Sequence, residues 1–306
     1  MTAPIVVWAF TDGKAGHENQ TRGLIAALAR LTPLDIRWIK APPYSSILTN
    51  LMTKRFLPGA ALPSPDLLIG AGHRTHLPMI AARRARGGRS IVLMKPSLPR
   101  VWFDLAVIPE HDRVSGDHVF VTRGALNAVQ PGEKGARSGL ILIGGPSRHH
   151  GWRENELLAQ VEAVVKRDNK IQWTLTSSRR TPPSTLARLA GLKAKNLDVV
   201  PVAKTGPEWL PSRLATARQA WVTEDSVSMV YEALTAGCAT GILAVPARGR
   251  SRAQKKLQLG MESLVADKLV TRHADWQAGA SLAPANTPFN EAARVAEWIH
   301  HKWLAA

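Results

Sequence analysis

The sequence predicts an α/β protein built of two doubly wound, Rossmann-like domains that face a cleft. Three observations predict this class. Short apolar runs alternate with amphipathic stretches along the chain, which favours parallel sheets covered by helices. The alternation stops at the polar, glycine-rich segment Gln130–Ser138 and then starts again. The chain of 306 residues is long enough for two domains of ordinary size.

The first half contains brief, continuous apolar runs, as expected for parallel strands buried on both faces. The expected strands are Ile5–Ala9, Leu34–Ile39, Asp66–Gly70, Ser90–Met94, Asp104–Ile108 and Val119–Val121. Between the first two, the residues Leu24, Ala27, Leu28 and Leu31 recur at the spacing of one helix face. A second helix is expected over Leu77–Arg86.

The second half repeats the alternation of strand and helix. The expected strands are Gly139–Ile143, Ile171–Thr176, Leu197–Val200, Ala220–Val222 and Thr240–Val245. The expected helices are Arg153–Asp168, Pro183–Ala190, Pro207–Ala217, Ser226–Ala236 and a terminal helix over Asn290–Trp303. We therefore expect an N-terminal domain over residues 1–130, a C-terminal domain over 138–288, and a last helix in 289–306 that packs back on the first domain.

Composition narrows the classes of partner. Forty lysine and arginine residues against twenty-three acidic ones give a net charge of +17, which favours anionic partners or reflects free use of arginine. The basic residues are scattered and no nucleic-acid motif is present, so we expect no nucleic-acid partner. The single Cys238 excludes an internal disulfide, and the sequence shows neither a signal-peptide pattern nor a membrane-spanning run. We expect a cytoplasmic protein.

The loop after the first expected strand reads "TDGKAGHENQ". It has neither the Gly-Lys-Ser/Thr ending of a Walker loop nor the spacing of a dinucleotide fingerprint. Gly13 and Gly16 permit tight turns and a close approach of the backbone to a ligand. His17 stands at the mouth of the following helix, where it either acts as a general base or simply packs.

Further histidines follow other strands of the first half. In a doubly wound sheet the carboxyl ends of the strands form the ligand-binding edge, so these loops should lie near one another. "GAGHRTH" places His73 and Arg74 there, and "IPEHD" places His111 and Asp112 there. A zinc site made of three histidines is an alternative, but the spacing lacks a zinc signature and we expect no metal site.

Two loops of the second half suit a phosphate. Gly144 and Gly145 directly follow a strand, and "TSSRRTP" provides the hydroxyl of Ser177 and the guanidinium groups of Arg179 and Arg180. Hydroxyls beside paired guanidinium groups are suited to bind a diphosphate, although an exposed basic loop is the alternative.

The segment "TEDSVSMVYEALTAG" is the most informative one. Asp225 is the expected N-cap of a helix whose first amides, those of Ser226, Ser228 and Met229, form an anion site. Glu232 lies one turn beyond Ser228 on the same face, where a carboxylate can accept both hydroxyls of a ribose. A plain amphipathic helix with a solvent-facing glutamate is the alternative.

Six motifs in order, from "WAFTDGKAGHENQTRGL" through "IGAGHRTH", "IPEHD", "IGGPSRHHGW" and "TSSRRTP" to "TEDSVSMVYEALTAG", resemble the Elm family. The family is named for a plant mitochondrial-fission factor and is widespread in bacteria, where its members are described as glycosyltransferases. The resemblance covers both halves of the chain.

The chain also resembles GT-B glycosyltransferases, especially the lipid-linked N-acetylglucosamine transferase of peptidoglycan synthesis. Gly16–His17, Gly144–Gly145 and the helix from Glu232 to Gly237 match its acceptor loop, its second-domain glycine pair and its donor helix. Asp225–Ser226 stand where that enzyme has Ser-Gly, which puts the phosphate geometry in doubt.

The resemblance implies a GT-B glycosyltransferase that takes a nucleotide-diphosphate sugar as substrate and needs neither a metal nor a cofactor. Its catalytic base is expected to be His17, with His111 or Asp112 as the rival. The acceptor loops are expected to contribute Asp12, Gly13, Lys14, Gly16, His73 and Arg74. The donor residues are expected to be Gly144, Gly145, Ser177, Arg179, Arg180, Asp225, Ser226, Ser228, Met229 and Glu232.

Two alternatives stay open: a nucleotide-sugar epimerase on the same fold, and a non-catalytic scaffold at membranes. The apolar segment Tyr44–Pro65 carries Lys54 and Arg55, so it either docks on an anionic membrane near a lipid-linked, cell-envelope acceptor or packs on its own domain. If it docks, the protein is peripheral on the inner face of the cytoplasmic membrane.

Overall fold

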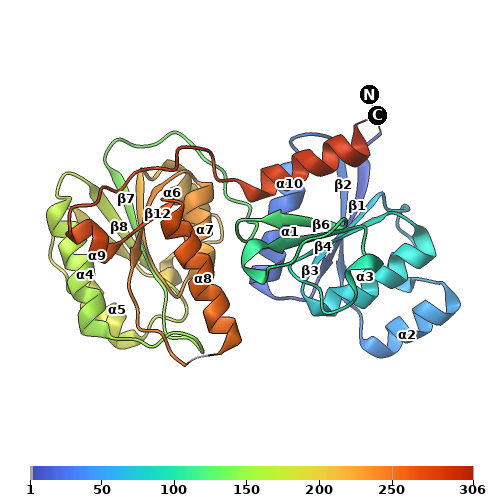
Figure 1. The fold of residues 1–306 in the computed structure, drawn as a ribbon, viewed down its shortest axis with the longest axis horizontal. Helices are drawn as coiled ribbons and strands as arrows, with labels where there is room; N and C mark the ends of the chain where they lie inside the picture. Colours follow the sequence, from blue (N-terminus) through green and yellow to red (C-terminus); the bar gives the residue numbers. More distant parts are fainter. Residues whose placement is uncertain (1–2, 250, 306) are drawn as a thin grey trace. The chain divides into compact units, whose positions relative to one another are not determined.

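The structure is a computed structural model that describes residues 3–249 and 251–305. The chain forms two compact units. Unit 1 comprises Met1–Ala128 with Asn290–Ala306, and unit 2 comprises Val129–Phe289 (Figure 1). Each unit has its own six-stranded sheet, and the strand pairings within both sheets are parallel. The α/β class and the two Rossmann-like sheets are therefore confirmed.

The sheet of unit 1 has the strand order β2-β1-β3-β4-β5-β6. Its strands are β1 Ile5–Thr11, β2 Leu34–Lys40, β3 Leu67–Ala71, β4 Arg89–Leu93, β5 Leu105–Pro109 and β6 Val119–Thr122. The chain winds outward from β1 to β2 and then crosses to β3 on the other side. The crossing point between β1 and β3 is where the loops diverge and where such sheets bind ligands.

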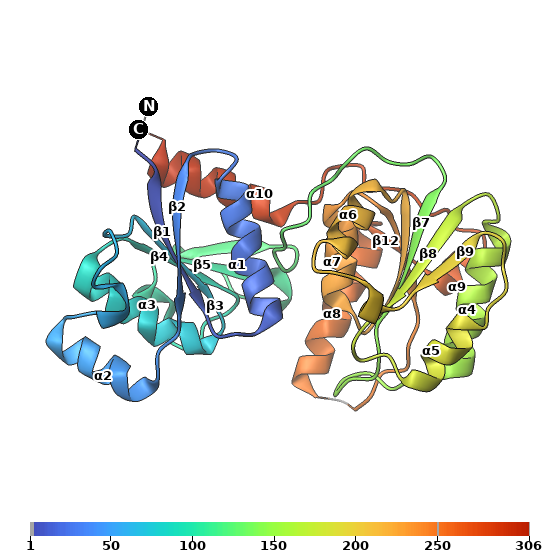
Figure 2. The same ribbon diagram turned by 180° about the vertical axis from the view of Figure 1, so that it is seen from behind.

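Helices cover both faces of this sheet. One face packs against α1 (Ala15–Leu28) and α10 (Glu291–Ile299), and the other against α2 (Tyr44–Thr53) and α3 (His73–Arg86) (Figures 1 and 2). The alternation of side chains along β1 explains the two cores. Val7 and Ala9 point to the α1 face, whereas Trp8 and Phe10 point to the α3 face.

The last helix belongs to unit 1, although unit 2 separates it from the rest of that unit in the sequence. Its apolar residues Val295 and Ile299 are fully buried in the core beneath α1. Glu291 is 3% exposed, accepts a hydrogen bond from the Arg123 amide (2.9 Å) and pairs with Arg294 (2.7 Å). This carboxylate therefore fixes the start of α10 to the end of β6.

The sheet of unit 2 has the order β12-β11-β10-β7-β8-β9. Its strands are β7 Ser138–Ile143, β8 Gln172–Ser177, β9 Leu197–Val200, β10 Gln219–Thr223, β11 Ala239–Leu243 and β12 Val270–Arg272. Its helices are α4 Glu154–Arg167, α5 Pro183–Ala190, α6 Trp209–Thr216, α7 Val227–Thr235, α8 Arg252–Ala266 and α9 His273–Gln277. The crossing point here lies between β7 and β10.

Several elements differ from the sequence-based expectation. β1 runs two residues further than expected, to Thr11, and α1 already begins at Ala15, so the expected ten-residue loop shortens to Asp12–Lys14. No element was expected from the sequence between Val245 and Asn290, whereas the structure has α8, β12 and α9 there. The expected last helix ends at Ile299 and continues as a short π-helical turn, His300–Leu304.

Candidate functional site

The loop between β1 and α1 brings a carboxylate and an imidazole together. The Nδ1 atom of His17, in the first turn of α1, lies 2.9 Å from Oδ2 of Asp12 and 3.1 Å from its Oδ1. The side chain of Asp12 is fully buried, whereas that of His17 is 20% exposed. Because Nδ1 is engaged with the carboxylate, Nε2 is the ring atom left for a substrate.

The surroundings of Asp12 keep its carboxyl ionised. Burial acts to raise the pKa of Asp12, but the hydrogen bonds from the Lys14 amide and from His17 outweigh burial and hold the pKa below its ordinary value. An ionised Asp12 accepts a hydrogen bond from Nδ1–H, so the unprotonated Nε2 can take a proton. Asp12, which the sequence analysis placed in the acceptor site, therefore positions His17 in the structure.

The loop after β3 encloses this pair. Gly72 has φ +87°, and a Cβ atom there would overlap His17 Nδ1 and approach Asp12 Oδ2 to 3.0 Å. Glycine is thus required both by the backbone conformation and by the close approach of the pair. His73 and Arg74 follow in the exposed first turn of α3. This helix comes directly after β3, the strand next to β1.

His76, which was not singled out from the sequence, lies one turn further along α3 and is 3% exposed. Burial, followed by the charges of His73 and His17, lowers the pKa of His76 to about 4. Its Nδ1 lies 3.2 Å from Ser97 Oγ, and its ring packs against the edge of Phe103. His76 is therefore a neutral packing residue at neutral pH.

The rival base lies at the same edge of the sheet but not beside His17. His111 and Asp112 form the short helical turn Glu110–Asp112 directly after β5. β5 is the third strand along from β1, and strands lie about 4.8 Å apart, so their ends are separated by about 14 Å. The loops after β1 and β3, which bring Asp12, His17 and Gly72 together, follow neighbouring strands, whereas the turn with His111 and Asp112 follows a strand that is not adjacent to β1.

In unit 2, the glycine pair after β7 packs against the loop after β10. The Gly144 amide donates to Thr223 Oγ1 (2.7 Å), and the Gly145 amide donates to Asp225 Oδ2 (3.0 Å). A Cβ atom on either glycine would overlap its neighbours, Asp225 at Gly144 and Arg180 at Gly145. Both amides already have acceptors, so binding of a phosphate by them requires these bonds to open.

The expectation that Asp225 is the N-cap of α7 is wrong, and its expected contact with a nucleotide stays a prediction. α7 begins at Val227 with Ser226 as its N-cap residue, and neither side chain caps the helix. The side chain of Asp225 is instead fully buried and pairs with Arg180 Nη2 at 2.7 Å. The Ser226 amide donates to the Thr223 carbonyl (3.0 Å), so it is not part of an anion site. The first-turn amides that helix geometry leaves without acceptors are those of Val227, Ser228 and Met229.

A cavity of about 380 Å³ opens beside these amides, at the carboxyl ends of β8 and β9. Its lining residues are Thr176, Ser177, Ser178, Arg179, Arg180, Val202, Thr205, Trp209, Leu210, Ser226, Ser228 and Met229. Six residues predicted for the donor site are therefore brought to one cavity. Guanidinium groups and hydroxyls line one part of the cavity, and the apolar residue Val202 after β9 with Trp209 and Leu210 in the first turn of α6 lines another.

The apolar wall, Val202, Trp209 and Leu210, was missed by the sequence analysis. The available signal was a tryptophan at the start of a helix that follows a strand on the ligand-binding edge. Ser177 is buried, and its Oγ accepts a hydrogen bond from the Val202 amide (3.1 Å), so it joins the two walls. Glu232 is half-buried one turn beyond Ser228 and does not line this cavity, so its contact with a ribose stays a prediction.

Within residues 3–249 and 251–305, no three His, Cys, Asp or Glu residues are grouped so that they could hold a metal ion. Across the same ranges, no helix has the length and apolar character needed to cross a bilayer.

Two parallel, doubly wound units with a polar edge at each crossing point define the GT-B fold class. Residues 15–303 match the sequence family described as Mitochondrial fission ELM1. The chain therefore belongs to that family. A search of curated proteins finds no relative with significant sequence similarity.

Solved structures with the same fold support the class. MurG from Acinetobacter baumannii is 14% identical with a TM-score of 0.55 and covers 97% of this chain and 100% of its own. The glycosyltransferase SnogD from Streptomyces nogalater is 13% identical with a TM-score of 0.52, covering 97% of this chain and 95% of its own.

An epimerase has the same fold. The UDP-GlcNAc 2-epimerase of Methanocaldococcus jannaschii, in complex with UDP-GlcNAc and UDP, is 11% identical with a TM-score of 0.50 and covers 98% of this chain and 100% of its own. At such identities the likeness concerns the fold alone.

Proposed function

We propose that this protein is a GT-B-type glycosyltransferase that moves a sugar from a nucleoside-diphosphate sugar to an acceptor hydroxyl. The observation that carries it is the cavity of unit 2, where guanidinium groups, hydroxyls and the first residues of α7 surround one space at the carboxyl ends of β8 and β9. The fold shared with UDP-GlcNAc-binding and glycosyltransferase structures supports the same class of donor.

The donor binds in unit 2 in two parts. The nucleobase packs on the apolar wall of Val202, Trp209 and Leu210, and the diphosphate lies at the amides of α7 beside Arg179. Arg179 is exposed, whereas Arg180 is held by Asp225, so Arg179 is the side chain free to turn to a phosphate. Glu232 then accepts the ribose hydroxyls.

Unit 1 supplies the base. His17 Nε2 takes the proton of the acceptor hydroxyl while the acceptor oxygen attacks the anomeric carbon, and the nucleoside diphosphate leaves with the electron pair of the broken C–O bond. Asp12 stabilises the imidazolium that forms. Lys14, His73 and Arg74 are exposed around the pair; Lys14 and Arg74 offer cationic contacts to an acceptor, and His73 offers a hydrogen-bonding group.

The helix amides and Arg179 offset the charge of the leaving diphosphate, so we propose transfer without a metal ion. Chelation by EDTA should leave the rate unchanged, and a rate restored only by Mg²⁺ or Mn²⁺ would contradict this part of the mechanism.

The decisive experiment is a thermal-shift panel of UDP, GDP, CDP, ADP, TDP and CMP on the wild type, Trp209→Ala and Glu232→Ala. A ligand at a hundred times its Kd stabilises the protein by about 2.7 kcal/mol, which is readily detected. We expect one diphosphate to raise Tm and both variants to reduce the rise. Trp298→Ala, a substitution in unit 1, is the matched control. Absence of any shift in the wild type would favour a scaffold.

An epimerase is the second candidate, because the M. jannaschii epimerase has the same fold. It would convert the donor without any acceptor. Product analysis of the donor alone separates the two: a new sugar epimer indicates an epimerase, whereas slow hydrolysis or no change indicates a transferase.

The acceptor is proposed to be lipid-linked, because unit 1 exposes apolar and basic side chains together. Met52, Leu57 and Trp102 are 87%, 70% and 46% exposed. Arg83 donates to the Trp102 carbonyl (3.4 Å) and Arg86 to the Gly59 carbonyl (2.9 Å). The end of α3 therefore contacts both short helical turns, Leu57–Gly59 and Arg100–Trp102.

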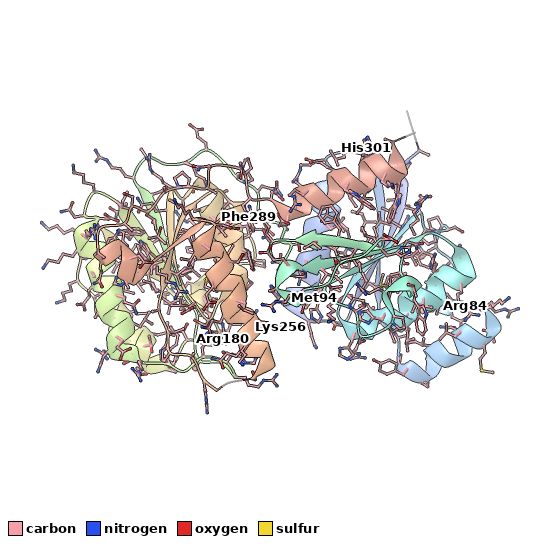
Figure 3. All side chains as sticks on the ribbon, viewed as in Figure 1. Arg84, Met94, Arg180, Lys256, Phe289 and His301 are labelled. Carbon is pink, nitrogen blue, oxygen red and sulfur yellow. The ribbon has the colours of Figure 1, made fainter. Side chains whose placement is uncertain are left out.

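We call this region the α2 surface; it comprises Tyr44, Met52, Lys54, Arg55, Leu57, Arg84, Arg100, Val101 and Trp102. Residues 41–103 contain nine lysine and arginine residues and a single acidic residue, Asp66. Arg84 extends beside α2 at the outer end of α3 (Figure 3). An anionic membrane would match this charge and bury the apolar side chains.

Vesicle sedimentation tests membrane docking. Lys54→Glu with Arg55→Glu should reduce binding to phosphatidylglycerol vesicles, whereas the control Lys193→Glu with Lys195→Glu, an equal charge change on exposed residues of unit 2, should not. Equal losses in both variants would indicate attraction by net charge alone, and unchanged binding would exclude the α2 surface as the docking site.

A further inference from the structure

The strand β2 forms one edge of the sheet of unit 1. Within residues 3–249 and 251–305, β1 is the only strand that pairs with it, so its outer side presents unpaired backbone amides and carbonyls. Proteins commonly protect such an edge with a proline, a bulge or a very short strand. β2 has seven residues, LDIRWIK, and none of them is proline. This edge is therefore open to pairing with another strand.

The peptide groups of β2 alternate between its two sides. The Ile5 amide donates to the Pro33 carbonyl (2.9 Å), and the Ala41 amide donates to the Thr11 carbonyl (2.8 Å). Odd-numbered positions of the strand therefore direct their amides and carbonyls to β1, because these groups alternate along a strand. The residues whose amides and carbonyls face outward are Leu34, Ile36, Trp38 and Lys40.

Two exposed apolar side chains belong to the residues with outward-facing backbone groups. Ile36 and Trp38 are 38% and 39% exposed. The register pairs them with Val7 and Ala9 of β1, so both lie on the sheet face that α1 covers. Arg22 of α1 lies over the Trp38 ring, 4.6 Å from its centroid, and leaves it partly open. Burial of these side chains against a partner would be favourable.

On the other face, β2 carries an acid and a base. Asp35 and Arg37 pair with each other at 2.8 Å, and their side chains are 29% and 45% exposed. The first five residues of β2 thus read apolar, acidic, apolar, basic, apolar. This order is complementary to itself in the reverse direction. An antiparallel copy centred on Ile36 places Asp35 of one chain opposite Arg37 of the other, and Leu34 lies opposite Trp38 in the same register.

Backbone and charge together select this register. Even-numbered residues carry the outward groups, so they must face even-numbered residues of the second strand. A two-fold axis at Arg37 would bring two arginines together, and one at Asp35 would bring two aspartates together. With the axis at Ile36, two pairs of opposite charge form at the positions without hydrogen bonds, where facing side chains are closest.

We propose that the protein forms a two-fold symmetric dimer in which β2 of one chain pairs antiparallel with β2 of a second copy. The interface uses the same patch of both chains and joins their two six-stranded sheets into one. The pair of Asp35 and Arg37 within each chain is exchanged for two pairs between chains. The carboxyl ends of the strands then point in opposite directions, so the dimer brings no second copy to His17. Dimerisation is thus separate from the proposed chemistry.

Sedimentation equilibrium of the full chain over a concentration series measures the Kd of the dimer. Asp35→Arg places an arginine opposite Arg37 and should raise this Kd about tenfold or more, since symmetry repeats the pair. Arg37→Asp should raise it similarly. The control Asp117→Arg, an equal charge change at an exposed position of unit 1, should leave it unchanged. Circular dichroism verifies that each variant is folded.

A mixture of the two variants tests the register. Asp35→Arg presents arginine at both positions, and Arg37→Asp presents aspartate at both, so a mixed dimer regains two pairs of opposite charge. The mixture should therefore dimerise about as tightly as the wild type, whereas neither variant should do so alone. Ile36→Lys brings two lysines together at the axis and should also weaken the dimer.

Three results would each overturn the dimer. They are a wild type that is monomeric throughout the series, a Kd that the substitutions in β2 do not change, and a mixture that stays monomeric.

Discussion

The pair of Asp12 and His17 has consequences that single substitutions can measure. Asp12→Asn should lower turnover of the donor about 10²–10⁴-fold, because a neutral amide neither fixes the Nδ1–H tautomer nor stabilises the imidazolium. Affinity for a nucleoside diphosphate should not change, because its proposed site lies in unit 2. Steady-state kinetics measures the turnover, and ¹⁵N NMR of the His17 imidazole reports its tautomer.

The control for this prediction is His111→Ala, which leaves the pair intact. A full rate in His17→Ala together with a strong loss in His111→Ala would move the base to the turn after β5.

His76 predicts a pH dependence of stability. The pKa of His76 is about 4 in the folded protein and about 6.5 in the unfolded chain. Between these values the unfolded state binds a proton that the folded state does not, so stability falls as the pH falls from 6.5 to 4. The total effect is of the order of 3 kcal/mol.

Between pH 7 and pH 4.5, the free energy of unfolding should therefore fall more in the wild type than in His76→Gln. His118→Gln, at an exposed position, is the matched control. Parallel pH profiles of wild type and His76→Gln would show that the buried imidazole does not contribute.

At the residue scale, the sequence predicted which side chains gather at the ligand-binding edges better than it predicted their roles. Residue type and strand position predicted that His17 would follow the first strand and that Arg179 would follow a strand of the second half, and the structure has them after β1 and β8. They did not reveal that Asp225 would turn inward to Arg180, because that contact joins loops 45 residues apart. Gly144 and Gly145 were expected to approach a phosphate, and the structure shows them approaching protein atoms.

At the scale of elements, α10 is fixed by a buried carboxylate. Glu291→Ala removes the acceptor of the Arg123 amide and the partner of Arg294, so the free energy of unfolding should fall by about 1–3 kcal/mol. Urea denaturation measures the change. Glu297→Ala, at an exposed position on the same helix, should alter it by less than about 0.5 kcal/mol. Equal effects of the two would contradict the anchoring role.

Elements with a clear apolar period were predictable, and those without one were not. β12 has three residues, too few for a pattern to emerge. α8 opens with the basic and polar run Arg252–Lys256 and contains Gly260, so its helical spacing is obscured.

At the scale of the whole molecule, the two units respond differently to loss of the last helix. Deleting residues 290–306 exposes the apolar core beneath α1, so unit 1 should unfold at lower denaturant concentration than in the full chain. Any stabilisation by a nucleotide should be retained, because the proposed nucleotide site lies in unit 2. Tryptophan fluorescence and ligand-dependent Tm separate the two transitions. Unfolding of both units in a single transition would show that the units fold only together.

The chain path of unit 1 has a consequence for synthesis on the ribosome. Translation proceeds at about 5–20 residues per second, so roughly ten to thirty seconds separate the end of β6 from the start of α10. During that interval the nascent N-terminal segment lacks the helix that covers its core, and unit 2 is synthesised up to its last residue, Phe289, before the first residue of α10 is added. Newly made chains should therefore acquire protease resistance in unit 2 first. A chaperone that shields apolar surface should bind the N-terminal segment, which is synthesised first.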